Sequence, residues 1–196
     1  DLDGTISRSA GTSTLTITGT SDLGGSITTS GTQDYEGAVT VTGNSTLTTT
    51  SAQITFDTTV NSETGETNNL TITASELQVD GIIGGSRTLG AISITGILDL
   101  NAAITNATSL SVSTTSNLGA NVTTSSTQTY SDAVTLSADV TLTTTDSNIT
   151  FSSTIDSDSG DSKRDLTLTL GSGSASITGI VGTTSLADIT LNSSAT

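Results

Sequence analysis

Apolar and hydroxyl-bearing residues alternate along almost the whole chain. The pattern apolar–hydroxyl–apolar occurs at residues 15–17, 39–41, 70–72, 92–94, 110–112, 166–168 and 189–191. A period of two is typical of a β-strand with one buried face, and the β-branched residues that fill it suit such a surface. Apolar residues do not recur at helical spacing over any useful length. The sequence therefore predicts an all-β chain.

The chain also contains two copies of one unit. Residues 32–62 align without a gap to residues 127–157, with 16 identities in 31 positions. The similarity extends in both directions with an offset between 95 and 98 residues. We therefore expect two repeat units, 1–98 and 99–196, that form one continuous solenoid within a longer tandem array.

A shorter period lies inside each unit. Triplets of this kind begin at 15, 39, 70, 92, 110, 134, 166 and 189, an average spacing of about 24 residues. Further apolar positions follow each triplet, and Gly, Asn, Asp and Ser lie between them. Three short strands in each turn of about 24 residues predict a parallel β-helix with about four turns per unit. Eight turns would span roughly 38 Å at ~4.8 Å each.

Tandem immunoglobulin-like β-sandwiches are the alternative all-β fold, since each unit has the length of such a domain. Sandwiches are usually built around a buried aromatic residue, often Trp, and frequently carry Pro in their loops. The chain has no Trp and no Pro, and each unit has one Tyr and one Phe. The period of about 24 residues also has no natural place in a sandwich, so the β-helix is favoured.

Composition first suggests disorder, because 46 Thr and 32 Ser make up about two-fifths of the 196 residues. The ordered alternation and the absence of Pro argue against it. The lack of His and Cys excludes a zinc or thiolate site, a Ser-His-Asp triad and disulfides. Nineteen acidic residues against four basic ones give a net charge of −15, which disfavours nucleic-acid binding. No apolar run reaches the ~18 residues of a membrane helix.

The runs TQTYSDAVTL, LTTTDSNITF and LTLTLGSGSASITGIVGTTSLADITL resemble repeats of large bacterial surface proteins, the filamentous-haemagglutinin-like and autotransporter-like adhesins. The resemblance covers nearly the whole chain twice. It implies a right-handed parallel β-helix, export to the cell surface, and a role as a stalk, adhesin or biofilm-matrix filament. The chain begins at Asp1 rather than Met, so we expect a piece of a longer protein whose signal peptide lies elsewhere.

Two acidic segments are candidates for Ca²⁺. Asp156, Asp158 and Asp161 place oxygen ligands at i, i+2 and i+5 beside a glycine. The matching loop of the first unit has a different spacing, and the closing glutamate of an EF-hand loop is missing. A solvated loop is therefore the favoured interpretation. Residues 1–4, Asp-Leu-Asp-Gly, are interpreted as a strand end followed by a turn.

The remaining candidate functional residues are the four aromatic rings and the outward-facing threonines. Tyr35 and Tyr130 lie beside Gln33 and Gln128 at equivalent positions. An exposed ring would stack on a sugar, whereas a ring that caps the core is the interpretation we favour. Phe56 and Phe151 are expected in the core. Threonine ladders are also found in ice-binding solenoids, but unequal turn lengths make a flat lattice hard to build.

The sequence thus predicts a structural or adhesive protein rather than an enzyme, because the acidic residues are scattered and no unit has a distinctive polar patch. We expect no cofactor, with Ca²⁺ as the one open alternative. The expected partners are neighbouring repeats or head-to-tail copies, and a host or matrix glycan or protein. A calcium-dependent or carbohydrate-binding adhesin module is the second hypothesis.

Overall fold

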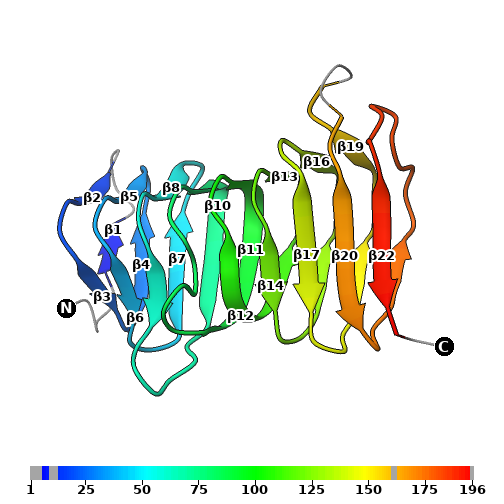
Figure 1. Cartoon of the computed structure of the whole chain (residues 1–196). Helices are drawn as coiled ribbons and strands as arrows, with labels where there is room; N and C mark the ends of the chain where they lie inside the picture. Colours follow the sequence, from blue (N-terminus) through cyan, green and yellow to red (C-terminus); the bar gives the residue numbers. More distant parts are fainter. Residues whose placement is uncertain (1–5, 9–12, 160–162, 195–196) are drawn as a thin grey trace.

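The computed structural model shows a parallel β-helix and describes residues 6–8, 13–159 and 163–194. Successive turns stack along one axis, with the two ends of the chain at opposite ends of the stack (Figure 1). All strand pairings between turns are parallel in the described part, and no helix is present there. The predicted β-helix is confirmed, and the sandwich alternative is wrong because sandwiches pair antiparallel strands.

Three faces, which we call A, B and C, surround the core. Face A stacks β1 (Ile6–Arg8), β4 (Ser26–Thr29), β7 (Ser45–Thr49), the first part of β10 (Leu70–Val79), the first part of β11 (Leu89–Leu100), the second part of β12 (Ile104–Val112), β15 (Gln128–Tyr130), β18 (Ile149–Phe151) and β21 (Ala175–Ile177). Face B stacks β2 (Leu15–Ile17), β5 (Gln33–Tyr35), β8 (Gln53–Phe56), the second parts of β10 and β11, β13 (Ser116–Leu118), β16 (Val134–Leu136), β19 (Ile155–Ser157) and a bridge at Val181.

Face C stacks β3 (Ser21–Leu23), β6 (Val39–Val41), β9 (Val60–Ser62), a bridge at Ile83, the start of β12, β14 (Val122–Thr124), β17 (Val140–Thr144), β20 (Leu166–Gly171) and β22 (Ile189–Ser193). Within the described residues, each face thus has nine layers. The eight steps between them amount to roughly 38 Å at ~4.8 Å per step.

Turn length varies along the helix. Paired residues on adjacent layers are separated by 17 residues at Ala107 and Thr124 and by 26 at Ile149 and Ala175. The predicted spacing of about 24 falls within this range. However, the triplets from which it was counted lie on different faces: the one at Leu15 is on face B, and the one at Val39 is on face C.

The core is a set of stacked aliphatic and aromatic side chains. On face A, Ile27, Leu47, Ile72, Ile94, Val112, Tyr130 and Phe151 follow one another in register and are all buried. Three-residue strands with buried ends and a more exposed middle residue recur along the helix, as in β6 and β16. This is the predicted alternation, with apolar residues inside and hydroxyl residues outside.

The two repeat units are not separated by a break. The predicted boundary between residues 98 and 99 falls inside β11, which bends from face A to face B. Leu98, Leu100 and Ile104 are buried on both sides of the boundary. The core therefore continues from one unit into the next.

Equivalent strands of the two units lie on different faces. After β5 on face B, the chain visits faces C, A and B in four full circuits, and then face C with β14 and face A with β15. The repeat therefore comprises four and two-thirds turns. The same shift by one face relates β7 to β17 and β2 to the second part of β12. A single unit corresponds to about 22 Å of axial rise at ~4.8 Å per turn.

Candidate functional site

The densest charged feature comprises the middle of β19 and the loop between β19 and β20, where the predicted calcium residues lie. Asp156 accepts hydrogen bonds from the Thr183 hydroxyl at 2.6 Å and the Thr184 amide at 2.8 Å. Burial alone would raise the pKa of Asp156, but these hydrogen bonds outweigh it and lower that pKa. Asp158 has a different partner, and Asp161 lies outside the described residues, as do residues 1–4. No group of three metal-ligating acidic side chains forms within the described ranges.

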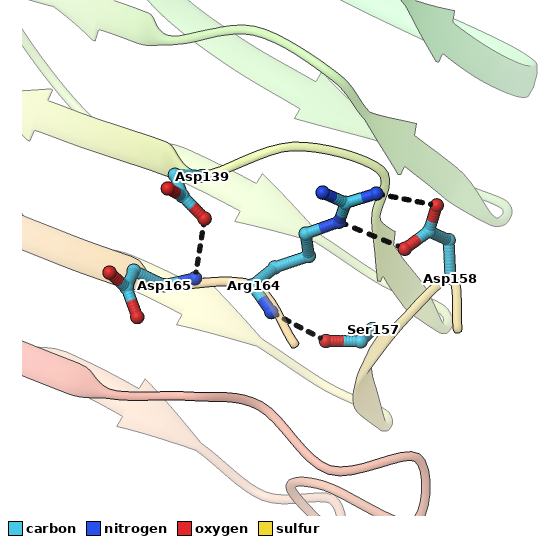
Figure 2. A network of polar contacts seen from close by, with 5 residues as sticks. All are labelled: Asp139, Ser157, Asp158, Arg164 and Asp165. Carbon is cyan, nitrogen blue, oxygen red and sulfur yellow. Dashed lines mark hydrogen bonds and ion pairs between the residues drawn. The ribbon is translucent and has the colours of Figure 1, made fainter. Parts of the chain in front are cut away.

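Asp158 forms a bidentate ion pair with Arg164. The Arg164 Nε and Nη2 atoms each donate to one carboxylate oxygen of Asp158 at 3.0 Å (Figure 2). These charge-assisted bonds hold the pKa of the Asp158 carboxyl below its ordinary value. The cation that Asp158 contacts is therefore the guanidinium of its own loop.

The base of this loop is closed by two backbone contacts. The Arg164 amide donates to the Ser157 hydroxyl at 3.0 Å, and the Asp165 amide donates to Asp139 Oδ1 at 3.0 Å (Figure 2). The first unit has the same arrangement: the Asn68 amide donates to the Ser62 hydroxyl at 2.9 Å. Asn44 Oδ1 likewise accepts from the Asn69 amide at 2.8 Å. Because both units contain these two hydrogen bonds, they are a structural feature of the repeat.

Asn and Asp side chains also join successive layers next to the strands. Asp165 Oδ1 accepts from the Asp188 amide at 3.0 Å, so Asp139, Asp165 and Asp188 form a stack of three carboxylates. In the first unit Asn44 and Asn69 hold the equivalent positions, and Asn69 Oδ1 accepts from the Ala91 amide at 2.7 Å. The geometry is shared, and the second unit carries negative charge where the first is neutral.

Face B carries a strip of acidic and amide side chains on its outer surface. Asn101 Nδ2 donates to Asp80 at 2.9 Å and to Asp99 at 3.3 Å, and Asn117 Nδ2 donates to Asp99 at 2.8 Å. Gln53 Nε2 similarly donates to Glu76 at 2.6 Å. Amide donors on this face thus bond to carboxylates of neighbouring layers. The strip links turns through side chains, in addition to the backbone ladders.

Asp34 also lies on face B, and its pKa is shifted in the opposite direction from those of Asp156 and Asp158. Burial, together with the negative charge of Asp57, raises the pKa of its carboxyl. This direction is the one expected for a carboxylate that is partly withdrawn from water and has a like charge nearby.

The tyrosines are part of the core. Tyr35 and Tyr130 are each 0% exposed, and burial raises the pKa of both phenols far above the ordinary range. Tyr35 lies 5.3 Å from Phe56 between ring centroids, and Tyr130 lies 5.1 Å from Phe151. The expectation that Phe56 and Phe151 are core residues is confirmed, and the tyrosine rings, which were expected to cap the core, are fully buried within it. A buried ring cannot stack on a sugar.

Each tyrosine shares a buried polar cluster with a glutamine. The Tyr35 hydroxyl donates to Gln33 Oε1 at 3.0 Å, and the Tyr130 hydroxyl donates to Gln128 Oε1 at 3.2 Å. Gln33 Nε2 donates to the Thr48 carbonyl at 2.9 Å, and Gln128 Nε2 donates to the Thr143 carbonyl at 2.9 Å. Both glutamines are fully buried. The amide thus satisfies polar groups in the core that water cannot reach.

The sequence did not assign this role to the glutamines. The available signal was a Gln at an inward position of the alternating pattern, present in both units two residues before the Tyr. An inward polar residue that is repeated in both units indicates a satisfied buried group.

Comparison of the chain with protein-family models, with curated proteins and with solved structures gives no match. No helix in the described part of the chain is long and apolar enough to cross a membrane. The fold and the contacts of the described residues are therefore the basis for a functional proposal.

Proposed function

We propose that this chain is a structural segment of a secreted bacterial surface protein, where it serves as a stalk or as part of an extracellular filament. The observation that supports this proposal is the unbroken core and the three strand ladders, which run through both repeat units. Residues 98 and 99 lie inside one strand, so the units have no hinge between them. A rod of this kind holds its two ends at a fixed distance.

The proposed role is mechanical and involves no catalytic step. Every layer is bonded to the next through backbone ladders on three faces, and side chains such as Asn101 and Asp165 add bonds between layers. Separating two layers requires these bonds to break together, so the rod resists extension along its axis. Each residue contacts only neighbouring layers, as in other solenoids, so length can be added by adding units.

Two measurements test the proposal. In cells of the organism that encodes the chain, an antibody raised against it should label intact, unpermeabilised cells. A duplicated form, with residues 99–196 repeated once, should lengthen the rod by about 22 Å at ~4.8 Å per turn in small-angle scattering. Labelling that requires permeabilisation would overturn the surface location. An unchanged maximum dimension would overturn the role as a spacer.

Binding assays separate a stalk from an adhesin module. A stalk gives no saturable signal on a glycan array and no heat on titration with Ca²⁺. Saturable glycan binding, or Ca²⁺ binding that is lost in Asp156→Asn, would replace the structural proposal with a calcium-dependent or carbohydrate-binding adhesin. Asp132→Asn on a different loop is the matched control for loss of one negative charge.

A further inference from the structure

Face A carries two columns of hydroxyl side chains on its outer surface. On its strands from β4 to β21, a Ser or Thr lies on each side of an inward-facing residue, as Thr71 and Thr73 do around Ile72. The first column is Ser26, Thr46, Thr71, Ser93, Ser111, Thr129, Thr150 and Ser176. The second column is Thr28, Thr48, Thr73, Thr95, Ser113, Ser131, Ser152 and Thr178. Together they form a lattice of hydroxyl groups, which we call the hydroxyl lattice.

The hydroxyl lattice stays in register although the turns differ in length. The extra residues of longer turns lie in connections between faces, such as those from β9 to β10 and from β19 to β20. The register shift in β10 falls after Thr73, outside the lattice. Neighbouring positions are therefore ~4.8 Å apart along the axis and roughly 6.7 Å apart along a strand. Unequal turn lengths thus do not interrupt the lattice on this face.

A high content of Ser and Thr does not by itself account for the lattice. The outward positions at the middle of the face B strands are occupied by Thr16, Asp34, Thr55, Gln78, Asp99, Asn117, Thr135 and Asp156. The repeat does not account for it either, because equivalent strands lie on different faces. Thr129 in the lattice corresponds to Asp34 on face B. The acidic residues of the chain are thus absent from the lattice positions of face A.

The hydroxyl groups of the lattice are available to water. Every one of these side chains is exposed or half-exposed. Within the described residues, the Thr178 hydroxyl is the one that bonds to the protein, at 3.3 Å to the Phe151 carbonyl. Because β-branched threonine has few rotamers, its hydroxyl and methyl groups hold nearly fixed positions. The surface therefore presents ordered, unused hydrogen-bonding groups.

We propose that the hydroxyl lattice of face A binds ice. Its two spacings are close to those between water molecules on a prism face of hexagonal ice, so water held by the hydroxyls lies where the crystal continues. The threonine methyl groups add apolar surface, whose removal from liquid water favours adsorption. This function goes beyond the proposed role as a stalk, and neither function requires the other.

A crystalline polysaccharide is the other extended partner that presents hydroxyl groups at regular spacing. Sugar rings are commonly bound by stacking on exposed aromatic side chains, but Tyr130 and Phe151 on this face are both buried. The lattice also contains no charged residue, although the chain has a net charge of −15. A charged group holds its own hydration shell, which does not fit the arrangement of water in ice. Both observations favour ice.

Inhibition of ice recrystallisation tests the proposal. The chain is frozen in sucrose solution, and the growth of ice crystals is followed by microscopy. We expect the parent chain to slow this growth and Thr95→Lys to lose the effect. Thr95 is exposed and lies between Thr73 and Ser113, so a lysine stem there holds neighbouring hydroxyls off the crystal. Hydrogen bonds of about 1 kcal/mol each are then lost together, which should raise the effective concentration at least about tenfold.

Matched variants separate the lattice from the rest of the surface. Thr55→Lys makes the same change at an outward position of face B and should retain the activity of the parent chain. Ser152→Lys repeats the test at an exposed lattice position of the second unit, and Thr135→Lys on face B is its control. Circular dichroism verifies that each variant keeps its β-sheet content.

Loss of inhibition in the two face A variants, with retention in the two face B variants, supports the proposal. A folded parent chain without effect on ice growth, or equal loss on both faces, would overturn it. Adsorption to crystalline cellulose without any effect on ice would also overturn it, in favour of a polysaccharide. None of these results changes the length of the rod, so the stalk proposal is tested separately.

Discussion

Gln33 and Gln128 hold the same position in the two repeat units, yet they lie on different faces of the β-helix. Gln33 belongs to β5 on face B, and Gln128 belongs to β15 on face A. Each donates its amide to a backbone carbonyl at 2.9 Å and accepts from a tyrosine hydroxyl two residues away. The contacts of a residue thus depend on its position within the repeat unit. The face on which it lies depends on the number of turns that precede it.

The glutamine cluster should contribute equally to stability in both units. Gln33→Leu leaves the Thr48 carbonyl and the Tyr35 hydroxyl without their partner in a dry core, so we expect a loss of about 2–3 kcal/mol. Gln128→Leu should cost the same within about 0.5 kcal/mol, since its contacts match. Urea unfolding followed by circular dichroism measures both variants.

Tyr35→Phe is the control for this prediction. It removes one hydroxyl and retains the ring packed at a tilt against Phe56, so the expected cost is only about 1 kcal/mol. A loss for Tyr35→Phe as large as that for Gln33→Leu would contradict the central role of the amide.

Gly84 should tolerate no side chain. Its φ angle is +75°, and an added Cβ would meet the Asn106 carbonyl oxygen on the next turn. Gly84→Ala combines backbone strain with a clash against backbone, and we expect it to cost more than about 2 kcal/mol in thermal or urea unfolding.

Gly19→Ala provides the matched control. Nothing lies within 4 Å of the Cβ position at Gly19, and its φ angle is not in the left-handed region. The change should stay within about 0.5 kcal/mol of the parent chain. Equal effects at Gly19 and Gly84 would refute the close approach of the two turns.

Replacing one carboxylate in the stack of the second unit with a neutral residue should increase the stability of the fold. Asp165→Asn keeps the oxygen that accepts from the Asp188 amide and removes a charge between Asp139 and Asp188, as Asn69 does in the first unit. We expect a gain of up to about 0.5 kcal/mol at low salt. The gain should shrink at high salt because repulsion is screened.

Asp165→Ala separates the charge from the hydrogen bond. It removes the same charge but also the acceptor, so it should cost about 1 kcal/mol relative to Asp165→Asn. If Asp165→Ala were as stable as Asp165→Asn, the hydrogen bond from the Asp188 amide to the Asp165 side chain would not contribute to stability.

The Asp158–Arg164 pair should make the loop sensitive to acid. The pKa of Asp158 is lower in the folded chain than its ordinary value of 3.8 because Arg164 hydrogen-bonds to the carboxylate. The pair therefore stabilises the fold above pH ~3.8, and this contribution is lost as pH falls through the lowered pKa. Hydrogen exchange of loop amides across this range should show the opening.

Arg164→Gln tests the cause of that shift. Without the guanidinium, the pKa of Asp158 in a carboxyl NMR titration should return toward its ordinary value. Arg87→Gln, on a loop whose arginine contacts Thr64 and Ser86 instead, should leave the Asp158 titration unchanged. An unaltered Asp158 pKa in Arg164→Gln would contradict the ion pair.

The sequence predicts only part of the candidate site. Burial of Phe56 and Phe151 follows from the alternating pattern, and it was predicted. The partner of Asp158 was not, because an acidic cluster in a loop has the same sequence whether it faces solvent, Ca²⁺ or Arg164. The bond between Asp139 and Asp165 joins residues 26 positions apart and exists only once two turns have stacked.

The sequence by itself determined that this protein is all-β, that its strands alternate between an apolar and a hydroxyl face, and that two equivalent units follow one another. Alternation with a period of two distinguishes inside from outside, but it does not distinguish between three walls that share one core. Only the tertiary structure placed Gln33 on face B and Gln128 on face A, because that assignment depends on where the chain bends and on how each turn stacks on the one before. The repeat in sequence and the turn in space are therefore different periods, and four and two-thirds turns is the relation between them.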